Sequence, residues 1–203
     1  PGACCFENHQ CTFVAESDCT DQGGTCWRAG IACDPLPCPM VYRVPSEYAD
    51  IQAAVDAACP GTTVLVADGI YRNEETPGNG NIDPGGKDLR LVSENGSQST
   101  ILELSGGRGF VFQSGESRDF LLQGFTIRSG YVSETFGGGI VCDHASPTVV
   151  DCVVDQCAAT GLVYGRGGGV ACIEASPAFV QCSITRCMAY YDTGPGGGGI
   201  YVR

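Results

Sequence analysis

The chain carries 14 cysteines, the residues best able to form covalent or metal bonds, and their spacing divides them into two groups. The first group lies within residues 4–59 and the second within residues 142–187. The first has no paired CxxC units and His9 as its only histidine, a spacing that suits zinc poorly. Disulfide bonds in an oxidising, extracellular or cell-surface setting are the better interpretation. The disulfide candidates are Cys4, Cys5, Cys11, Cys19, Cys26, Cys33, Cys38, Cys59, Cys142, Cys152, Cys157, Cys172, Cys182 and Cys187.

Charged side chains that could take part in catalysis lie in the C-terminal half: Asp143, Asp151, Asp155, Glu174, Arg128, Arg166 and Arg186. Neighbouring carboxylates can raise one another's pKa or share a metal ion. A repeat of 30 residues, described below, instead puts Ile173, Gln181 and Thr185 at the positions that match the three aspartates. We therefore expect the aspartates at solvent-exposed or turn positions and assign no catalytic residue. His144 has no second histidine or nucleophile near it in the repeat, and we expect a surface histidine.

Two further segments contain weak site signals. In "TPGNGNIDPGGKD", Asn79, Asn81 and Asp83 alternate as in a calcium-binding loop, but no bidentate glutamate follows. The alternative is a Gly/Asn/Pro loop without an ion, so Ca²⁺ is a weak candidate and no cofactor is required. "NGS" at Asn95 is a glycosylation sequon, a pattern that also arises by chance.

Composition excludes some classes of partner. The net charge is -12 with only 11 Lys and Arg residues, so the clustered cations that bind nucleic acid are missing. The sequence contains no run of about 18 apolar residues, so we expect no membrane-spanning helix. It begins at "PGACC" without an initiator methionine or a signal peptide, and we expect a processed or trimmed product.

The second cysteine group belongs to an internal repeat. "GGGIVCDHASPTVVDCVVDQCAATG" from Gly137 recurs 30 residues later as "GGGVACIEASPAFVQCSITRCMAYY" from Gly167, and "GGGIYVR" begins again at Gly197. A fixed period of this size predicts stacked repeats. Each repeat contains short alternating stretches between Gly, Pro, Ser and Asp, which predicts strands. We interpret each as one coil of a parallel β-helix, with coils at 137–166 and 167–196 and an incomplete one at 197–203.

The repeat also predicts columns of inward-facing side chains. Stacking like on like at a strand spacing of about 4.8 Å fills such a core without large voids. That spacing also lies inside the Cα separation that a disulfide accepts, so bonds within a coil and between coils are both feasible. Buried free thiols are the alternative. The expected columns are Phe110, Ile140, Val170 and Ile200; Phe112 and Cys142; Phe125, Cys152 and Cys182; and Ile127, Val154 and Ile184.

The N-terminal part of the sequence predicts a small module followed by a capping helix. Residues 1–40 form a Cys-rich segment that is too small to fold by apolar burial alone, so we expect it to be disulfide-stapled. Residues 41–203 then form the β-helix. In "YADIQAAVDAACPGTTVLVADGIY" an amphipathic helix at about 48–58 precedes a strand, and it would cover the open edge of the first coil. If Cys59 pairs with the module, the module is fixed to that end.

The chain resembles the pectin lyase-like superfamily of right-handed, single-stranded parallel β-helices. The resemblance rests on this helix-then-strand opening, on "KDLRLVSENGSQSTILEL", on "FLLQGFTIRSG" and on the "GGGI" coils, and it covers residues 42–203. It implies a secreted bacterial surface protein with an N-terminal Cys-rich module. Enzymes of this family use grouped carboxylates, which the sequence does not match. Cys157 and Cys187 stand where such coils often carry asparagine.

Two functions fit these observations. The first is a non-enzymatic extracellular structural protein that forms a fibre or surface assembly by head-to-tail stacking, because Gly199, Ile200, Tyr201 and Val202 would leave a strand edge open to another copy of the chain. The second is a polysaccharide-active enzyme (lyase or hydrolase) or a glycan-binding module. A fragment of a longer surface protein would also explain the open edge. The aromatic residues that could stack on sugars are Tyr131, Phe136, Tyr164, Tyr190 and Tyr191.

Overall fold

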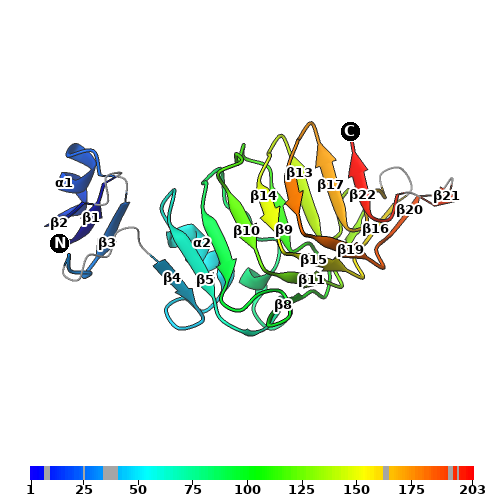
Figure 1. Ribbon diagram of the computed structural model, residues 1–203, viewed down its shortest axis with the longest axis horizontal. Helices are drawn as coiled ribbons and strands as arrows, with labels where there is room; N and C mark the ends of the chain where they lie inside the picture. The colour runs from blue at the N-terminus through cyan, green and yellow to red at the C-terminus, as the bar shows by residue number, and fades with distance from the viewer. Residues whose placement is uncertain (7–9, 25, 34–40, 162–164, 192–193, 196) are drawn as a thin grey trace.

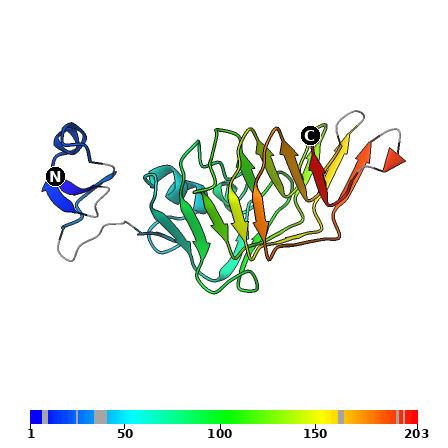
Figure 2. The same ribbon diagram turned by 45° about the horizontal axis from the view of Figure 1, so that its top comes forward.

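The computed structural model describes residues 1–6, 10–24, 26–33, 41–161, 165–191, 194–195 and 197–203. Figure 1 shows a small N-terminal module at one end of a stack of coils, and Figure 2 shows the strands of successive coils side by side. This arrangement confirms the predicted all-β fold, a parallel β-helix. In the part of the chain described, no helix is long and apolar enough to cross a bilayer.

The N-terminal module is an antiparallel sheet with one short helix against it. Strand β1 (Gly2–Cys5) lies between β2 (Cys11–Val14) and β3 (Cys26–Ala29), and α1 (Glu16–Asp21) carries the buried Cys19. Disulfides join Cys4 to Cys19, Cys11 to Cys33 and Cys26 to Cys59. Cys5 is also disulfide-bonded, and the candidate Cys38 lies outside the described residues.

The module is attached to the β-helix by covalent and polar contacts. The Cys26–Cys59 disulfide connects β3 to the segment after the capping helix. The Arg28 guanidinium donates a hydrogen bond of 3.0 Å to the Glu47 carboxylate and lies 4.8 Å from the centroid of the Tyr42 ring. The module is therefore held at the N-terminal end of the coils.

Four parallel ladders of strands run along the described coils. The first contains β4 (Val41–Val44), β5 (Thr63–Val66), β7 (Arg90–Ser93), β10 (Leu121–Gln123), β14 (Thr148–Val150) and β18 (Ala178–Val180). The second contains β6 (Gly69–Arg72), β8 (Thr100–Glu103), β11 (Thr126–Arg128), β15 (Val153–Asp155) and β19 (Ser183–Thr185). The third contains β9 (Phe110–Phe112), β13 (Ile140–Asp143), β17 (Val170–Ile173) and β22 (Ile200–Val202). The fourth contains β12 (Tyr131–Ser133), β16 (Ala158–Gly161) and β20 (Met188–Tyr191), with β21 (Gly194–Pro195) antiparallel at its edge.

The core is a set of stacked columns inside the coils. Ile140 pairs with Phe110 on one side and with Val170 on the other, and all three side chains are fully buried. Phe110 contacts Phe125 edge to face, with ring centroids 5.9 Å apart. Because successive strand residues point to opposite faces, this inward column leaves every second residue of the same ladder on the outer surface.

The capping helix forms at the predicted place and is slightly shorter. Helix α2 (Ile51–Ala57) begins after Asp50, whose side chain accepts a hydrogen bond of 2.8 Å from the Ala53 backbone. The Lys87 ammonium donates to the carbonyls of three residues at its C-terminal end, Val55, Asp56 and Ala58. These contacts satisfy backbone groups that a helix end otherwise leaves unpaired. A 3₁₀ turn, η1 (Pro77–Asn79), lies against the helix.

The repeated glycines mark places where two coils approach each other closely. A Cβ atom on Gly139 would lie 2.6 Å from Val154 Cγ1 and 2.8 Å from the carbonyl oxygen of Gly169. Both distances are shorter than ordinary van der Waals contact. A Cβ atom on Gly169, the third glycine of the next "GGG", would be similarly close to Ile184 Cγ2 and to the Gly199 carbonyl oxygen, so Gly139 and Gly169 permit the backbone of one coil to lie on the next.

Candidate functional site: a groove on the third ladder and its surroundings

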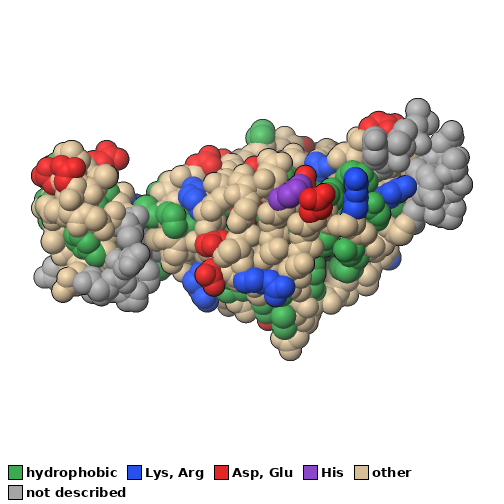
Figure 3. Space-filling model, turned by 90° about the horizontal axis from the view of Figure 1, so that it is seen from above, with side chains coloured by type: hydrophobic (Ala, Val, Ile, Leu, Met, Phe, Trp, Pro, Cys, Tyr) green, Lys and Arg blue, Asp and Glu red, His purple; other side chains and the backbone are tan. Residues whose placement is uncertain are grey.

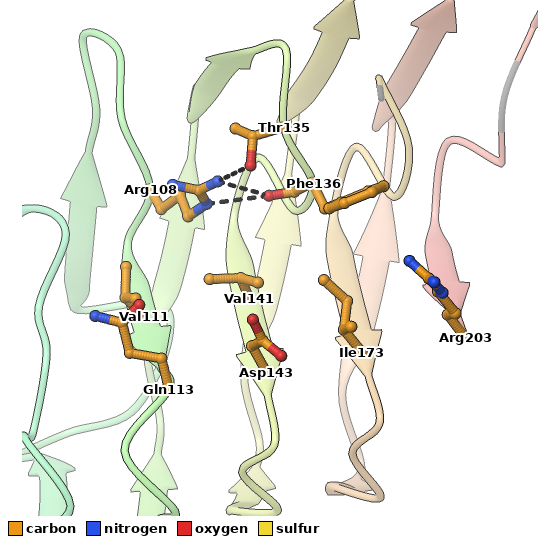
Figure 4. A pocket seen from close by; sticks show the side chains of 9 residues that line it. All are labelled: Arg108, Val111, Gln113, Thr135, Phe136, Val141, Asp143, Ile173 and Arg203. Carbon is orange, nitrogen blue, oxygen red and sulfur yellow. Dashed lines mark hydrogen bonds between the residues drawn. The ribbon is translucent and has the colours of Figure 1, made fainter. Parts of the chain in front are cut away.

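A groove of about 480 Å³ lies on the outer face of the third ladder. Val111, Val141 and Ile173 provide an apolar floor, because alternate residues of β9, β13 and β17 point outward. Polar groups follow in the same direction, from Gln113 directly after β9 and from Asp143 at the end of β13. Figure 4 shows the carboxylate of Asp143 near the middle of the groove, with Arg203 at the far side from Gln113.

The rim of the groove is held in place by a half-buried arginine. Arg108 Nε donates to the carbonyls of Phe136 and Gly137 at 3.1 and 3.0 Å, and Nη2 donates to Thr135 Oγ1 at 3.0 Å. Burial lowers the pKa of Arg108. The Phe136 ring stacks on the Tyr201 ring with centroids 5.5 Å apart and planes 6° apart. An apolar floor beside a fixed aromatic ring and hydrogen-bonding groups is a surface on which an extended polar ligand can lie.

A histidine bridges two carboxylates beside this groove. His144 Nδ1 lies 2.6 Å from Asp143 Oδ1, and His144 Nε2 lies 2.9 Å from Glu174 Oε2. Hydrogen bonding to Asp143, supported by the charge of Glu174, raises the pKa of His144. His144 is exposed at the surface, as expected, and its purple side chain is visible in Figure 3.

The expectation that no two carboxylates are neighbours was wrong for this pair. Asp143 is in register with Ile173, as the repeat predicts, but the next residue, Glu174, reaches the same imidazole from the adjacent coil. The contact is diagonal, and a comparison of equivalent positions does not detect it. His144 and Glu174 are exposed and Asp143 is half-buried, and the three side chains connect adjacent coils through polar contacts.

Asp155 also departs from the sequence-based expectation, since it is buried and does not face open solvent. Its carboxylate accepts hydrogen bonds from Arg186 and from Thr185 Oγ1, the latter over 2.9 Å. The Arg186 contact lowers the pKa of Asp155. Asp151, in contrast, is an exposed turn residue with a φ of 51°, in agreement with the expectation.

The Asp155 contact continues a column of alternating charge on the second ladder. Arg128 forms an ion pair with Glu103, its register partner on one side, and Asp155 is its register partner on the other. The Arg128 contact lowers the pKa of Glu103. These ion pairs account for Arg128 and Arg186 as contacts between coils. Arg166 instead donates a hydrogen bond of 3.1 Å to the Tyr201 hydroxyl.

The proposed calcium ligands each have a hydrogen-bonding role in the loop. Asn79 Oδ1 accepts from the backbone of Ile51 at 3.2 Å, and Asn81 Oδ1 accepts from the backbone of Arg108 at 2.9 Å. Asp83 accepts from Gly85 and Gln113. Within the described residues no group of three or more His, Cys, Asp or Glu side chains is arranged to hold a metal. Ca²⁺ binding there and its alternative, a loop without an ion, both stay predictions, and the hydrogen bonds that these side chains already make favour the loop without an ion.

The other predicted surface residues occupy separate places. Asn95 is exposed, and its amide donates hydrogen bonds of 3.1 Å to both carboxylate oxygens of Asp68. Tyr131 and Tyr190 are exposed on the fourth ladder, away from the groove. Tyr164 lies outside the described residues, and of Tyr191 only the backbone is described.

The predicted assembly edge lies on β22. Gly199 precedes the strand, and Ile200 and Val202 are 47 % and 67 % exposed, although they continue inward columns that are buried in the preceding coils. Tyr201 points to the outer face and stacks on Phe136. Within the described residues, core-type side chains therefore lie at the outer end of the last coil.

Sequence reasoning missed the groove residues Arg108, Gln113 and Arg203. The sequence did contain a signal for two of them. Outward-facing residues of successive coils recur every 30 residues, and this spacing connects Gln113, Asp143, Ile173 and Arg203. Comparison of the chain with models of protein families, with curated proteins and with solved structures finds no match.

Proposed function

We propose that the protein is a non-enzymatic structural protein of the extracellular space, whose β-helix stacks head to tail on a second copy in a fibre or surface assembly. The observation that carries this proposal is the apolar C-terminal coil face. Ile200 is 47 % exposed, whereas Val170 and Ile140, which precede it in the same column, are fully buried. Covering such a face with another coil removes apolar surface from water and pairs an open strand edge.

Two further observations support the proposal. The disulfides of the module are typical of proteins in oxidising compartments. The opposite end of the β-helix carries α2 and the module, so the two ends are chemically different, and a contact between unlike ends propagates rather than closing. We further propose that the fold belongs to the pectin lyase-like superfamily and is of the secreted bacterial surface type, on the basis of the helix-then-strand opening and the 30-residue coils.

The size of the particles tests this proposal. Sedimentation velocity of the 203-residue chain, with electron microscopy of the same samples, should show chains whose mass grows with protein concentration. Val202→Lys should shift the population to monomers, because an ammonium at the coil face opposes burial. Tyr131→Lys, a change at an exposed site on the side of the coils, should leave assembly unchanged. A wild-type chain that stays monomeric at every concentration would contradict the proposal.

The groove favours a second function, the binding of an extracellular polysaccharide. Its apolar floor, the fixed Phe136 ring and the side chains of Gln113 and Arg203 suit a sugar chain lying along the coils. Calorimetry with pectic and alginate oligosaccharides tests it. Gln113→Ala should weaken binding, and Arg90→Ala, which removes an exposed charge on another ladder, should not. Release of reducing ends or unsaturated products in the same mixtures would indicate an enzyme instead.

A further inference from the structure

The six cysteines of the repeat coils stand in stacked pairs. Cys142 is the register partner of Cys172 in β13 and β17. The other four flank β15 and β19, which pair in register. Backbone hydrogen bonds of 2.9 Å to the carbonyls of Cys152 and Cys157 continue that ladder past both ends of β15. The pairs are Cys142 with Cys172, Cys152 with Cys182, and Cys157 with Cys187.

Distance favours bonds between coils over bonds within a coil. Register partners in adjacent strands lie about 4.8 Å apart, inside the Cα range of about 4.4 to 6.8 Å for a disulfide. Within one coil, the extended strand β15 separates Cys152 from Cys157 by on the order of 15 Å. Cys157 Sγ also lies close to Gly139, which is three residues before Cys142 in the chain. Three extended residues span roughly 10 Å, so Cys157 and Cys142 of the same coil are too far apart for a disulfide.

The thiols already interact with their stacked partners. A hydrogen bond from Cys152 lowers the pKa of Cys182 to about 6, and a hydrogen bond from Cys157 lowers the pKa of Cys187 to about 7. Cys182 and Cys187 are half-buried, whereas Cys152 and Cys157 are buried. In both pairs the sulfur that solvent can reach is therefore the more acidic one, and the thiolate is the reactive form in disulfide exchange.

We propose that these pairs are sites of oxidative modification, at which a small-molecule disulfide such as oxidised glutathione converts each stacked pair into a disulfide between coils. The Cys182 thiolate attacks one sulfur of the oxidant, forms a mixed disulfide and releases the first thiolate. Cys152 gives its proton to solvent, and its sulfur attacks Cys182 Sγ and releases the second thiolate. The pair loses two electrons and two protons, and the oxidant is reduced to two thiols.

The same exchange joins Cys157 to Cys187 through the half-buried Cys187. Cys142 and Cys172 are both buried, so this pair should react last. Once formed, the three bonds would fasten two adjacent coils together on different sides of the β-helix. This inference does not depend on the proposed assembly or on the groove.

Peptide mapping of the oxidised protein tests the pairing. The protein is incubated with oxidised glutathione, its remaining thiols are alkylated, and it is digested without reduction. Cleavage before Asp151 and Asp155 and after Arg166, Glu174 and Arg186 places each of the six cysteines in its own peptide. The proposal predicts three linked peptide pairs that match the stacked partners. Six alkylated cysteines, or any other pairing among them, would overturn it.

Cys182→Ser gives a matched control. This variant should retain one alkylatable thiol, at Cys152, and should keep the other two linked pairs. Release of a different cysteine would show that Cys182 has another partner. The wild-type map decides the pairing even if the variant folds poorly, and the rate of alkylation before oxidation should be higher at Cys182 and Cys187 than at the buried Cys142.

Discussion

Replacement of Gly139 by alanine tests whether close approach between coils determines the "GGG" repeat. An added Cβ would lie 2.6 Å from Val154 Cγ1 and 2.8 Å from the Gly169 carbonyl oxygen. Val154 is almost fully buried, and the Gly169 carbonyl accepts a hydrogen bond of 2.9 Å from the Gly139 backbone. Neither neighbour can move without disturbing the core or the ladder between coils.

The expected cost follows from these contacts. Adding atoms to a well-packed core costs about 1 to 3 kcal/mol, and two fixed neighbours place Gly139→Ala in the upper part of that range. Loss of backbone freedom in the unfolded chain offsets about 0.4 to 1 kcal/mol. The net decrease in the free energy of unfolding should be about 2 kcal/mol, or roughly 4 to 8 °C in Tm for a chain of this size.

Gly199 provides the matched control, since it lies two repeats after Gly139 and holds the equivalent position in its coil. The nearest atom to a Cβ added at Gly199 is Ile184 Cγ2 at 4.0 Å, so Gly199→Ala meets no clash. It should raise the free energy of unfolding by up to about 1 kcal/mol, through the same loss of backbone freedom in the unfolded chain. Thermal unfolding followed by circular dichroism, with the disulfides intact, measures both variants. Equal shifts in Tm, or a larger shift for Gly199→Ala, would refute the argument.

Three further predictions concern polar contacts. Lys87→Met should lower the free energy of unfolding in urea by about 1 kcal/mol, because it removes the donor to the C-terminal carbonyls of α2. Asp155→Asn should lower Tm at pH 7, and this difference should shrink as acid protonates the wild-type carboxylate. The depressed pKa of Asp155 stabilises the fold above the unfolded value of about 3.9 and ceases to do so as pH falls through the folded value. Millimolar Ca²⁺ should leave Tm unchanged, since Asn79 and Asn81 accept backbone hydrogen bonds; a rise in Tm would reveal an ion site.

The coils could be predicted because each coil needs apolar residues at the same inward positions, and the sequence therefore repeats them every 30 residues. Ile140 and Val170 recur at 30 residues since each fills the same place in its coil, and Phe110 continues that column without the surrounding motif. The capping helix was readable from the apolar face of Ile51, Ala54 and Val55. In these elements, local pattern and burial agree.

The polar contacts were less predictable, because they join residues that are not equivalent in the repeat. His144 reaches Glu174 diagonally, and Asp155 is buried because Arg186, one residue beyond its register partner, covers it. The groove rim depends on the loop that Arg108 orders, which lies outside the repeating pattern. The periodicity of a single sequence identifies which residues stack on one another. It does not identify contacts such as these, which depend on the direction in which a side chain leaves its own column.

The alternating charges on the second ladder help to specify the order in which coils stack. The coils at 137–166 and 167–196 are close copies in sequence, so apolar columns alone would tolerate β11 pairing with β19 in place of β15. Such a mispairing would place Arg128 beside Thr185 instead of Asp155 and would remove the opposite charge that faces Arg128 in the native ladder. Opposite charges directly across a strand pair stabilise it, and a neutral partner does not. The column thus discriminates against a misfolded stack that hydrophobic packing would accept.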